Sequence, residues 1–479
     1  MHGAVWAILQ QLIRQALVAG FIFVIVRRVS PAELGLIGIA NIWNMFLYLF
    51  LELGFAAGLV QRKEIAPAQV AAAFLLNVAA GTILMLLSVL FSGPISHLMK
   101  APQAQPVIAT VSISFLLSAL ASTQIALAQR ELKFKAIALR DTAANSIAAV
   151  IGIVLALLDF GVWAVVANNL LLNLFLAAFV WRLTPMRIRP RQATRASFAE
   201  VWPYGSRVFA YSALKRLLAS ADSLLVGFFF GPEKLGLYNF AQRVTAAPTK
   251  AIQFGLATFL FPKASRLQDT PENLKDLFLR SFKILNYMIL LFSALLCTVG
   301  VELLLKIVGR QWEPAVEVIR ILVFLQLLGP VLVPLPEMLK ATNRPHWLLN
   351  WTLLQTCLSA AAVGFSSRFG FRMAIIVMVA ANWLLLPLLI WMTRQILQLS
   401  LIEFWRKIRL SYALSAITGA LLFVVWSRYQ GPQAILIAAS TLIGLLHLVI
   451  AHWLDPDLQH LRKALYEMPL RRGNESVQG

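Results

Sequence analysis

The chain has 479 residues, of which 59% are hydrophobic and 13% are charged, and its formal net charge is +21 at pH 7. Soluble proteins carry about 25% charged residues, so this composition excludes an ordinary soluble enzyme and indicates a protein with many membrane spans. The positive charge does not indicate nucleic-acid binding, because no long polar region remains to form a soluble basic domain.

Apolar runs follow one another along the whole chain, and each is long enough to cross a bilayer as a helix. We therefore predict an all-α polytopic membrane protein with about 14 transmembrane helices. Only residues 183–202 and 262–279 are expected to form loops of any length. The predicted spans are 4–26, 34–60, 69–92, 104–128, 140–159, 161–181, 203–230, 235–261, 280–300, 315–339, 346–366, 371–393, 408–426 and 433–453.

Basic residues are unevenly divided between the two sets of loops. With a cytoplasmic N-terminus, the inside loops hold 26 Lys and Arg residues and the outside loops hold 9. Because cytoplasmic loops are enriched in Lys and Arg, this asymmetry predicts that both termini are cytoplasmic.

Several predicted spans carry polar side chains at helical spacing. Each charge near the bilayer centre costs about 2.5–3.5 kcal/mol on insertion scales, so these side chains must face the bundle interior or a watery cavity. The acidic residues Glu52 and Asp222 are too few to neutralise the cations, so a net-positive cavity needs an anionic substrate. The predicted substrate-binding residues are Arg14, Asn41, Asn44, Tyr48, Tyr211, Lys215, Arg216, Arg243 and Lys250.

Other interpretations of these polar residues stay open. The asparagines alone are better explained by hydrogen bonds that hold helices together. Glu52 and Asp222 are candidates for binding a coupling H⁺ or Na⁺, or for salt bridges to nearby cations. No cofactor is expected, and none of the scattered histidines has metal-ligand spacing, so no metal site is predicted.

One short phrase occurs twice in the sequence. "SPAELGLIGIA" begins at Ser30, and "GPEKLGLYNFA" begins at Gly231, 201 residues later. At the same offset Arg14 falls on Lys215, and Arg62 falls on Lys263. Six predicted spans separate the copies, so both have the same orientation, as in a parallel repeat with a pseudo-two-fold axis along the membrane normal.

The repeat divides the chain into two pseudo-symmetric six-helix lobes plus two C-terminal helices. The predicted boundaries are 1–182 for the first lobe, 183–202 for a basic cytoplasmic linker, 203–395 for the second lobe, 396–454 for the last two helices and 455–479 for a cytoplasmic tail.

The order of several segments resembles a known family. These segments are "RRVSPAELGLIGIA", "LELGFAAGLVQRKE", "QRELKFKAIALRD", "DFGVWAVVANNL" and "DSLLVGFFFGPEKLGLYNFAQRV". They are similar to the polysaccharide-transport branch of the multidrug/oligosaccharidyl-lipid/polysaccharide exporter superfamily, and within it to Wzx-type flippases. No single segment is specific, but their order and spacing are.

The resemblance implies a bacterial inner-membrane flippase of an undecaprenyl-diphosphate-linked oligosaccharide, working by alternating access in the biosynthesis of lipopolysaccharide or exopolysaccharide. It also implies cavity cations, for which Arg14, Lys215, Arg216, Arg243 and Lys250 are the matching positions. Membrane lipids, a polysaccharide polymerase and chain-length machinery are the expected partners, and nucleic acid is not.

Three alternatives remain. A lipid II flippase would carry the same lipid and charge. A small-molecule exporter of the same superfamily would favour an acidic cavity. A membrane glycan polymerase or ligase would need a large outer loop with catalytic residues. Since no predicted outer loop is long and no GxSxG, Walker A, CxxC or HExxH motif is present, we expect a transporter and not an enzyme.

Overall fold

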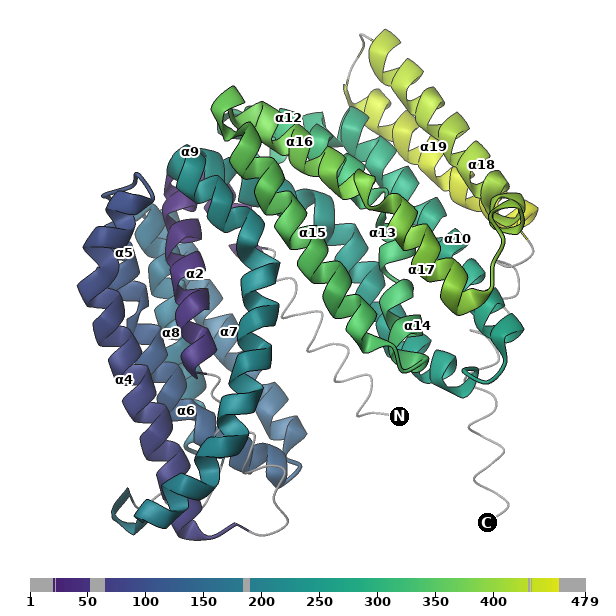
Figure 1. The fold of residues 1–479 in the computed structure, drawn as a ribbon. Coiled ribbons are helices and arrows are strands. Elements are labelled where there is room, and N and C mark those ends of the chain that lie inside the picture. The colour runs from purple at the N-terminus through teal and green to yellow at the C-terminus, as the bar shows by residue number, and fades with distance from the viewer. Residues whose placement is uncertain are drawn as a thin grey trace, which may run out of the picture. The chain divides into compact units, whose positions relative to one another are not determined.

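The computed structural model describes residues 20–21, 23–51, 65–183, 190–429, 431 and 433–455. These residues form helices joined by short turns and contain no strand (Figure 1), which confirms the all-α class. The helices up to the middle of the chain are α2 (Pro31–Leu51), α4 (Pro67–Leu98), α5 (Ala104–Val111), α6 (Ile113–Arg130), α7 (Phe134–Leu157), α8 (Val162–Val180), η1 (Pro190–Gln192) and α9 (Arg195–Arg266).

The remaining helices form the second part of the chain, where α15 and α16 lie side by side, as do α18 and α19 (Figure 1). Their bounds are α10 (Pro271–Leu295), η2 (Leu296–Gly300), α11 (Val301–Val308), η3 (Arg310–Trp312), α12 (Ala315–Gln326), α13 (Gly329–Leu332), α14 (Leu335–Ala341), α15 (Pro345–Ser366), η4 (Ser367–Phe369), α16 (Phe371–Leu384), α17 (Leu386–Leu397), α18 (Leu401–Arg428) and α19 (Gln433–Leu454).

The chain packs as two compact units. Unit 1 runs to Asn239 and includes residues 307–312, and unit 2 holds residues 240–306 and the chain from Glu313 onward. The boundary between the units lies inside α9. The lobe boundaries at 182 and 203 rest on the sequence repeat and stay a prediction.

Membrane-spanning character is present throughout the described residues. Nine of their helices are long and apolar enough to cross a bilayer, and the bent pair formed by α12 with α13 and α14 makes a tenth. Helix α2 and the two segments of α9 correspond to predicted spans 34–60, 203–230 and 235–261. The count of fourteen spans stays a prediction, because residues 1–19 and 52–64 are not among the residues that the structure describes.

The segments of α9 meet at Gly231, which has φ 77° and ψ −175°. Residues with a side chain rarely adopt positive φ, whereas glycine does so at little cost. This glycine therefore separates the two spans that the sequence predicts on either side of it.

Two predicted loops are wrong in extent. Helix α9 already begins at Arg195 and continues to Arg266, and α10 begins at Pro271, so most of 262–279 and part of 183–202 are helical. Hydropathy locates the apolar stretch within the bilayer, but a helix continues into water wherever its polar residues tolerate helical geometry.

Three predicted spans are interrupted. Span 315–339 bends by 51° after α12, where Gly329, Pro330 and Pro334 follow in close succession. Proline lacks a backbone N–H and clashes with the preceding turn, so it interrupts a helix. Span 104–128 divides at Ser112 into α5 and α6, and span 371–393 divides at Leu385 into α16 and α17.

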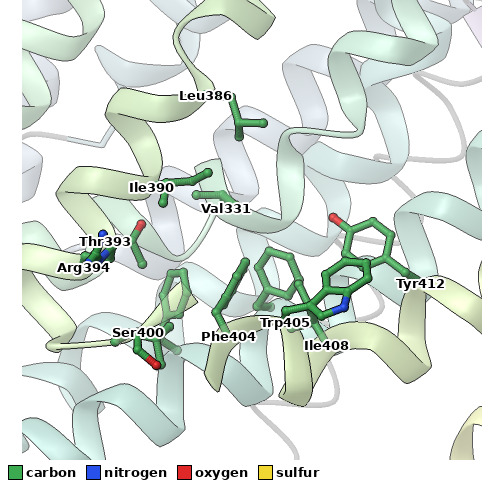
Figure 2. A pocket seen from close by; sticks show the side chains of 13 residues that line it. Val331, Leu386, Ile390, Thr393, Arg394, Ser400, Phe404, Trp405, Ile408 and Tyr412 are labelled. Atoms are coloured by element: carbon green, nitrogen blue, oxygen red, sulfur yellow. The ribbon is translucent and has the colours of Figure 1, made fainter. Parts of the chain in front are cut away.

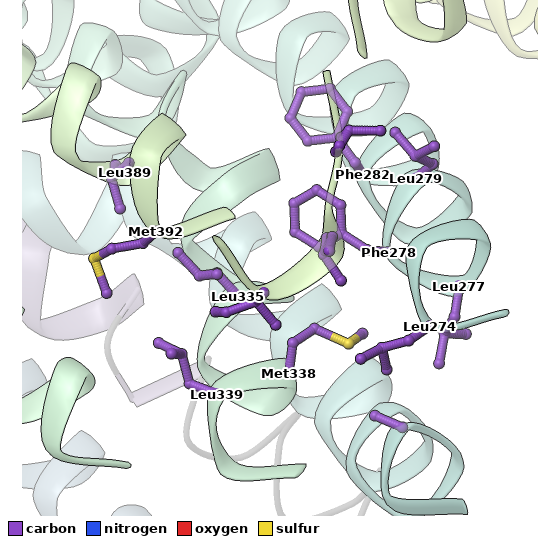
Figure 3. Packing of buried hydrophobic residues seen from close by; sticks show 14 of the residues in the cluster. Leu274, Leu277, Phe278, Leu279, Phe282, Leu335, Met338, Leu339, Leu389 and Met392 are labelled. Carbon is purple, nitrogen blue, oxygen red and sulfur yellow. The ribbon is translucent and has the colours of Figure 1, made fainter. Parts of the chain in front are cut away.

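Unit 2 has a large apolar core. Phe278 and Phe282 of α10 point toward Leu335 and Met338 of α14, and Met392 of α17 joins them (Figure 3). The two phenylalanines are four residues apart, so one face of α10 supplies both. Close packing of this kind, and not exclusion from water, holds helices together in a bilayer.

Candidate functional site

The two copies of the repeated phrase meet inside unit 1. A Cβ atom on Gly35 would lie 1.7 Å from the carbonyl oxygen of Pro232, and a Cβ on Gly236 would lie 1.9 Å from the carbonyl oxygen of Pro31. The pairs Pro31/Pro232 and Gly35/Gly236 are each related by the offset of 201 residues. The contact is therefore reciprocal, as a local two-fold axis requires, and only glycine permits so close a backbone approach.

Hydrogen bonds fix the start of α2 at this crossing. The Glu33 carboxylate accepts from the Ser30 backbone N–H at 2.8 Å, and the Ser30 hydroxyl accepts from the Glu33 N–H at 3.2 Å. This reciprocal pair is a capping box. The other Glu33 oxygen accepts from the Val162 N–H at 3.3 Å, which ties α2 to the start of α8.

Side chains from distant loops cap the helical turns that precede both phrases. Trp312 Nε1 and Gln311 Nε2 donate to the Val26 carbonyl at 2.7 and 2.8 Å. Before the second phrase, the Phe229 carbonyl accepts a hydrogen bond from Lys100 Nζ at 3.3 Å. The offset of 201 residues relates Phe229 to Arg28. All these residues belong to unit 1, so this end of the unit is a closed, hydrogen-bonded junction.

Two predicted site cations lie on the segment of α9 that belongs to unit 2. Arg243 and Lys250 are seven residues apart, which places them on one face of the helix, and both are exposed. Within the described part of the chain, neither side chain forms an ion pair or a hydrogen bond. Two unneutralised cations on one face of a membrane helix have the charge that an anion would need, and their role in substrate binding stays a prediction.

A polar contact and a helix break lie beside Lys250. The Thr249 hydroxyl donates to Gln326 Oε1 at 3.0 Å, at the end of α12, and the Thr249 methyl group lies near Gly329 at the bend. Broken helices in transporters commonly mark substrate or ion sites, because their free backbone groups can line a cavity.

The predicted coupling residue Asp222 is half-buried in unit 1. Its carboxylate is hydrogen-bonded to the side chain of Tyr238, which is itself buried. Directly after these two residues in the sequence, the Ser223 hydroxyl donates to Asn239 Oδ1 at 3.0 Å. Asp222 thus has a neutral partner in the described residues, and its role in coupling stays a prediction.

The remaining predicted residues are described only in part. Asn41 is exposed on α2. The backbones of Asn44 and Tyr48 lie on α2, and those of Tyr211, Lys215 and Arg216 lie on α9, but their side chains are not described. Arg14 and Glu52 lie outside the described residues.

Unit 2 contains a pocket that the sequence did not indicate. Its volume is about 280 Å³, and residues of α10, α17 and α18 form most of its lining. Thr393, Arg394 and Ser400 gather at one side of the pocket, and Trp405 and Tyr412 lie at the other (Figure 2). The remaining walls are mostly apolar, so the pocket suits a chain-like apolar group that ends near a positive charge.

The residues of this pocket come from four separate stretches of sequence. Phe278 and Phe282 lie more than a hundred residues before Arg394 along the chain. The one available signal was Arg394 itself, a cation that directly follows a long apolar run. Among the described residues, no group of three His, Cys, Asp or Glu side chains is placed to hold a metal ion.

Comparison with known proteins adds a family and a fold. Residues 24–317 match a family model described as "Polysaccharide biosynthesis protein". The teichuronic acid biosynthesis protein TuaB of Bacillus subtilis is 22% identical over 388 residues, which cover 80% of each chain. The lipopolysaccharide biosynthesis protein WzxC of Escherichia coli is 24% identical over 371 residues, which cover 76% of this chain and 74% of WzxC.

The fold also resembles a solved structure. The lipid II flippase MurJ in an inward closed conformation aligns with a TM-score of 0.72 and 12% identity, covering 94% of this chain and 99% of MurJ. At this level of identity the likeness establishes a shared fold and leaves the substrate open.

Proposed function

The chain belongs to the polysaccharide biosynthesis protein family, and we propose that it is a flippase that moves an undecaprenyl-diphosphate-linked oligosaccharide across the bacterial inner membrane. The protein acts as a transporter and not as an enzyme, and the oligosaccharide is a repeat unit of lipopolysaccharide or exopolysaccharide. Both termini are cytoplasmic in this proposal, as the distribution of Lys and Arg predicts.

The observation that carries the proposal is the pair of exposed, unpaired cations on α9. Arg243 and Lys250 share one face of a membrane helix and form no ion pair in the described residues. Each would cost about 2.5–3.5 kcal/mol if it faced hydrocarbon alone. A diphosphate group offsets this cost, because it offers several charged oxygens to both side chains.

The pocket of unit 2 supports a lipid-linked substrate. Its apolar walls, including Phe282, Phe404 and Ile408, suit part of a polyprenyl chain, and Arg394 at its polar side suits a phosphate. An exporter of small cations would instead need acidic residues at the equivalent places. The cationic surface therefore favours a phosphorylated lipid over a cationic drug.

The crossing of the two phrases supports alternating access. Each phrase follows the first helix of a predicted lobe. If the N-terminus is cytoplasmic, both of these helices end at the outer face of the membrane. The reciprocal Gly35–Pro232 and Gly236–Pro31 contacts then close the outer end, so the substrate enters from the cytoplasmic leaflet and leaves when this crossing opens. From the sequence, Glu52 and Asp222 are candidates for binding a coupling H⁺ or Na⁺. Polymerase and chain-length proteins would receive the product.

The proposal is tested by reconstituting the full chain in liposomes with a defined polyprenyl-diphosphate oligosaccharide and measuring its appearance in the opposite leaflet. The wild-type chain should flip this lipid, and Arg243→Ala combined with Lys250→Ala should stop flipping. Arg266→Ala, an exposed cation in the last turn of the same helix, is the matched control and should flip normally.

The same assay separates the alternatives. Lipid II flipped faster than the oligosaccharide lipid would assign the chain to peptidoglycan synthesis. Flipping of neither lipid would refute the proposal.

A further inference from the structure

A buried polar junction lies in unit 2, away from the cations of α9. Three helices contribute to it: α10 with Lys283, Asn286 and Tyr287, α18 with Ser411, Ser415 and Thr418, and α19 with Ser440 and His447, followed by Asp455. Every one of these residues is at most 8% exposed. On α18 they follow the spacing i, i+4, i+7, so one face of that helix is polar and turned inward.

Charged residues stand at one end of this junction. Lys283 Nζ lies 3.3 Å from one oxygen of Asp455, and the Tyr287 hydroxyl donates to the other oxygen at 3.3 Å. One turn away, the Asn286 amide donates to the Ser411 hydroxyl at 2.9 Å. Asp455 directly follows α19, so this end lies at the cytoplasmic side in the orientation predicted from Lys and Arg.

His447 lies deeper, two helical turns from Asp455, and its hydrogen bonds define its tautomer. Its Nδ1 atom is 2.8 Å from the Thr418 hydroxyl oxygen. The Thr418 hydroxyl has a single proton, and it donates this proton to the Leu414 carbonyl at 2.9 Å. With that proton directed to the Leu414 carbonyl, we assign Nδ1 as the donor in the His447–Thr418 bond and the lone pair to Nε2.

That lone pair is buried without a hydrogen-bond partner. Besides His447 Nε2, the Asn286 Oδ1, Ser415 Oγ and Ser440 Oγ atoms of the same junction are buried and unpartnered in the described structure. Buried polar atoms are nearly always satisfied by protein or by ordered water, so these four atoms along the junction call for water as their partner. The Tyr287 ring packs edge-on against the imidazole at 5.8 Å and connects it to Asp455.

Among the residues that the structure describes, few titratable groups surround His447. The elements packed against α19 are α10, α18 and η2. Helix α10 brings Lys283 and Tyr287, η2 brings the half-buried Cys297, and the polar face of α18 brings hydroxyl groups alone. Lys283 pairs with Asp455, so among the described groups of this junction the bare imidazole nitrogen is the one that we consider as a proton acceptor.

We propose that the junction of α10, α18 and α19 is a proton-binding site centred on His447 Nε2 and reached from the Asp455 end. The proton adds to Nε2 and forms an imidazolium, while the Nδ1–H bond to Thr418 is kept. A second part, which rests on the proposed transport function, is that this proton is coupled to flipping. The coupling site would then lie on the last two helices and not at Glu52 or Asp222.

The binding test uses the full chain in liposomes with ¹⁵N-labelled histidine, and it needs no substrate. Nitrogen spectra distinguish the two neutral tautomers and the imidazolium. His447 should show an unprotonated Nε2 at about pH 8 and lose that signal as the pH is lowered stepwise from there. A spectrum that does not change with pH, or a protonated Nε2 at the higher pH, would overturn the proposal.

Matched variants assign the signal. His447→Gln should remove it, whereas His452→Gln, on the same helix, should leave it in place. If His447→Gln does not fold, Thr418→Val keeps the imidazole but removes its acceptor. This variant should populate both neutral tautomers and shift protonation to lower pH, because the lost Nδ1–H bond to Thr418 is stronger in the charged imidazolium than in the neutral ring. An unchanged titration in Thr418→Val would contradict the assigned tautomer.

The coupling test measures flipping of the oligosaccharide lipid across the same pH range. The pH dependence of the rate should be lost in His447→Gln and kept in His452→Gln. If the spectra show protonation but flipping in His447→Gln retains its pH dependence, the site binds protons without coupling. Absence of flipping in the wild-type chain would instead refute the proposed function and leave the binding result standing.

Discussion

The two copies of the repeated phrase agree in their backbones and differ in their charges. Gly35 and Gly236 each lie against the proline carbonyl of the other copy. In contrast, the positions that correspond to Arg243 and Lys250 hold Ile42 and Leu49 in the first copy. Packing across a two-fold axis requires the same small residues on both sides, whereas positions away from this contact, such as Ile42 and Arg243, are free to differ.

The second difference concerns how the phrases begin. Glu33 forms a capping box at the start of α2, but the corresponding position holds Lys234, which pairs with its exposed neighbour Glu233. In the second copy the described residues form no such cap, and α9 instead kinks at Gly231, which has a positive φ. One geometry is thus stabilised by a side-chain cap in the first copy and by glycine's backbone freedom in the second.

The largest effect expected of a single substitution comes from adding one methyl group at the crossing. In Gly35→Ala the new Cβ would meet the Pro232 carbonyl at 1.7 Å, and this backbone atom cannot move without separating the helices. Overpacking of this kind costs about 1–3 kcal/mol. We expect export of polysaccharide to fall at least about tenfold in a complementation assay, since about 1.4 kcal/mol corresponds to a factor of ten.

Gly236→Ala should have the same effect, because the contact is reciprocal. Gly364→Ala is the control, as no neighbouring atom lies within 4 Å of the place that its new Cβ would take. A variant pair in which one glycine tolerates alanine and the other does not would show that the two copies do not share an axis.

A smaller effect is expected in the pocket of unit 2. Arg394→Ala removes the cation at its polar side and should raise the lipid concentration needed for half-maximal flipping about threefold to tenfold, since a charge-assisted contact at a partly exposed site contributes about 1 kcal/mol. Arg428→Ala, an exposed cation at the far end of α18, serves as the control. Equal kinetics for both variants would remove the pocket from substrate binding.

The smallest expected effect concerns the helix cap at Glu33, for which the described residues of the second copy have no counterpart. Glu33→Gln weakens the capping box and its bond to Val162, and loss of a cap typically costs about 1 kcal/mol. The midpoint of thermal unfolding should fall by a few degrees. Lys234→Gln, at the corresponding position, should leave it unchanged, and an equal loss in both variants would show that the two phrases begin in the same way.

The sequence was sufficient for features that depend on composition and period. It predicted the all-helical membrane class, the repeat and the helices that carry Arg243 and Lys250. It did not predict the interruption after α12, although Gly329 and Pro330 were visible, because a long apolar run with proline can also be one kinked helix.

Contacts between distant helices could not be predicted in the same way. Lys283 lies on α10, whereas His447 lies on α19 and Asp455 directly follows it, and nothing in the linear order shows that they share one junction. Similarly, the repeat predicted an axis but not that the two phrases touch at Gly35 and Gly236. Such pairings depend on how helices rotate and cross, which hydropathy does not encode.

The central claim is that the cations of the second copy bind the phosphorylated head of the lipid. It is tested most directly by measuring the affinity of the full chain, in nanodiscs, for undecaprenyl diphosphate. Arg243→Ala combined with Lys250→Ala should weaken binding at least about a hundredfold, because two charge-assisted contacts are lost. Arg266→Ala should bind as the wild type does. Unchanged affinity in the double variant would contradict the claim.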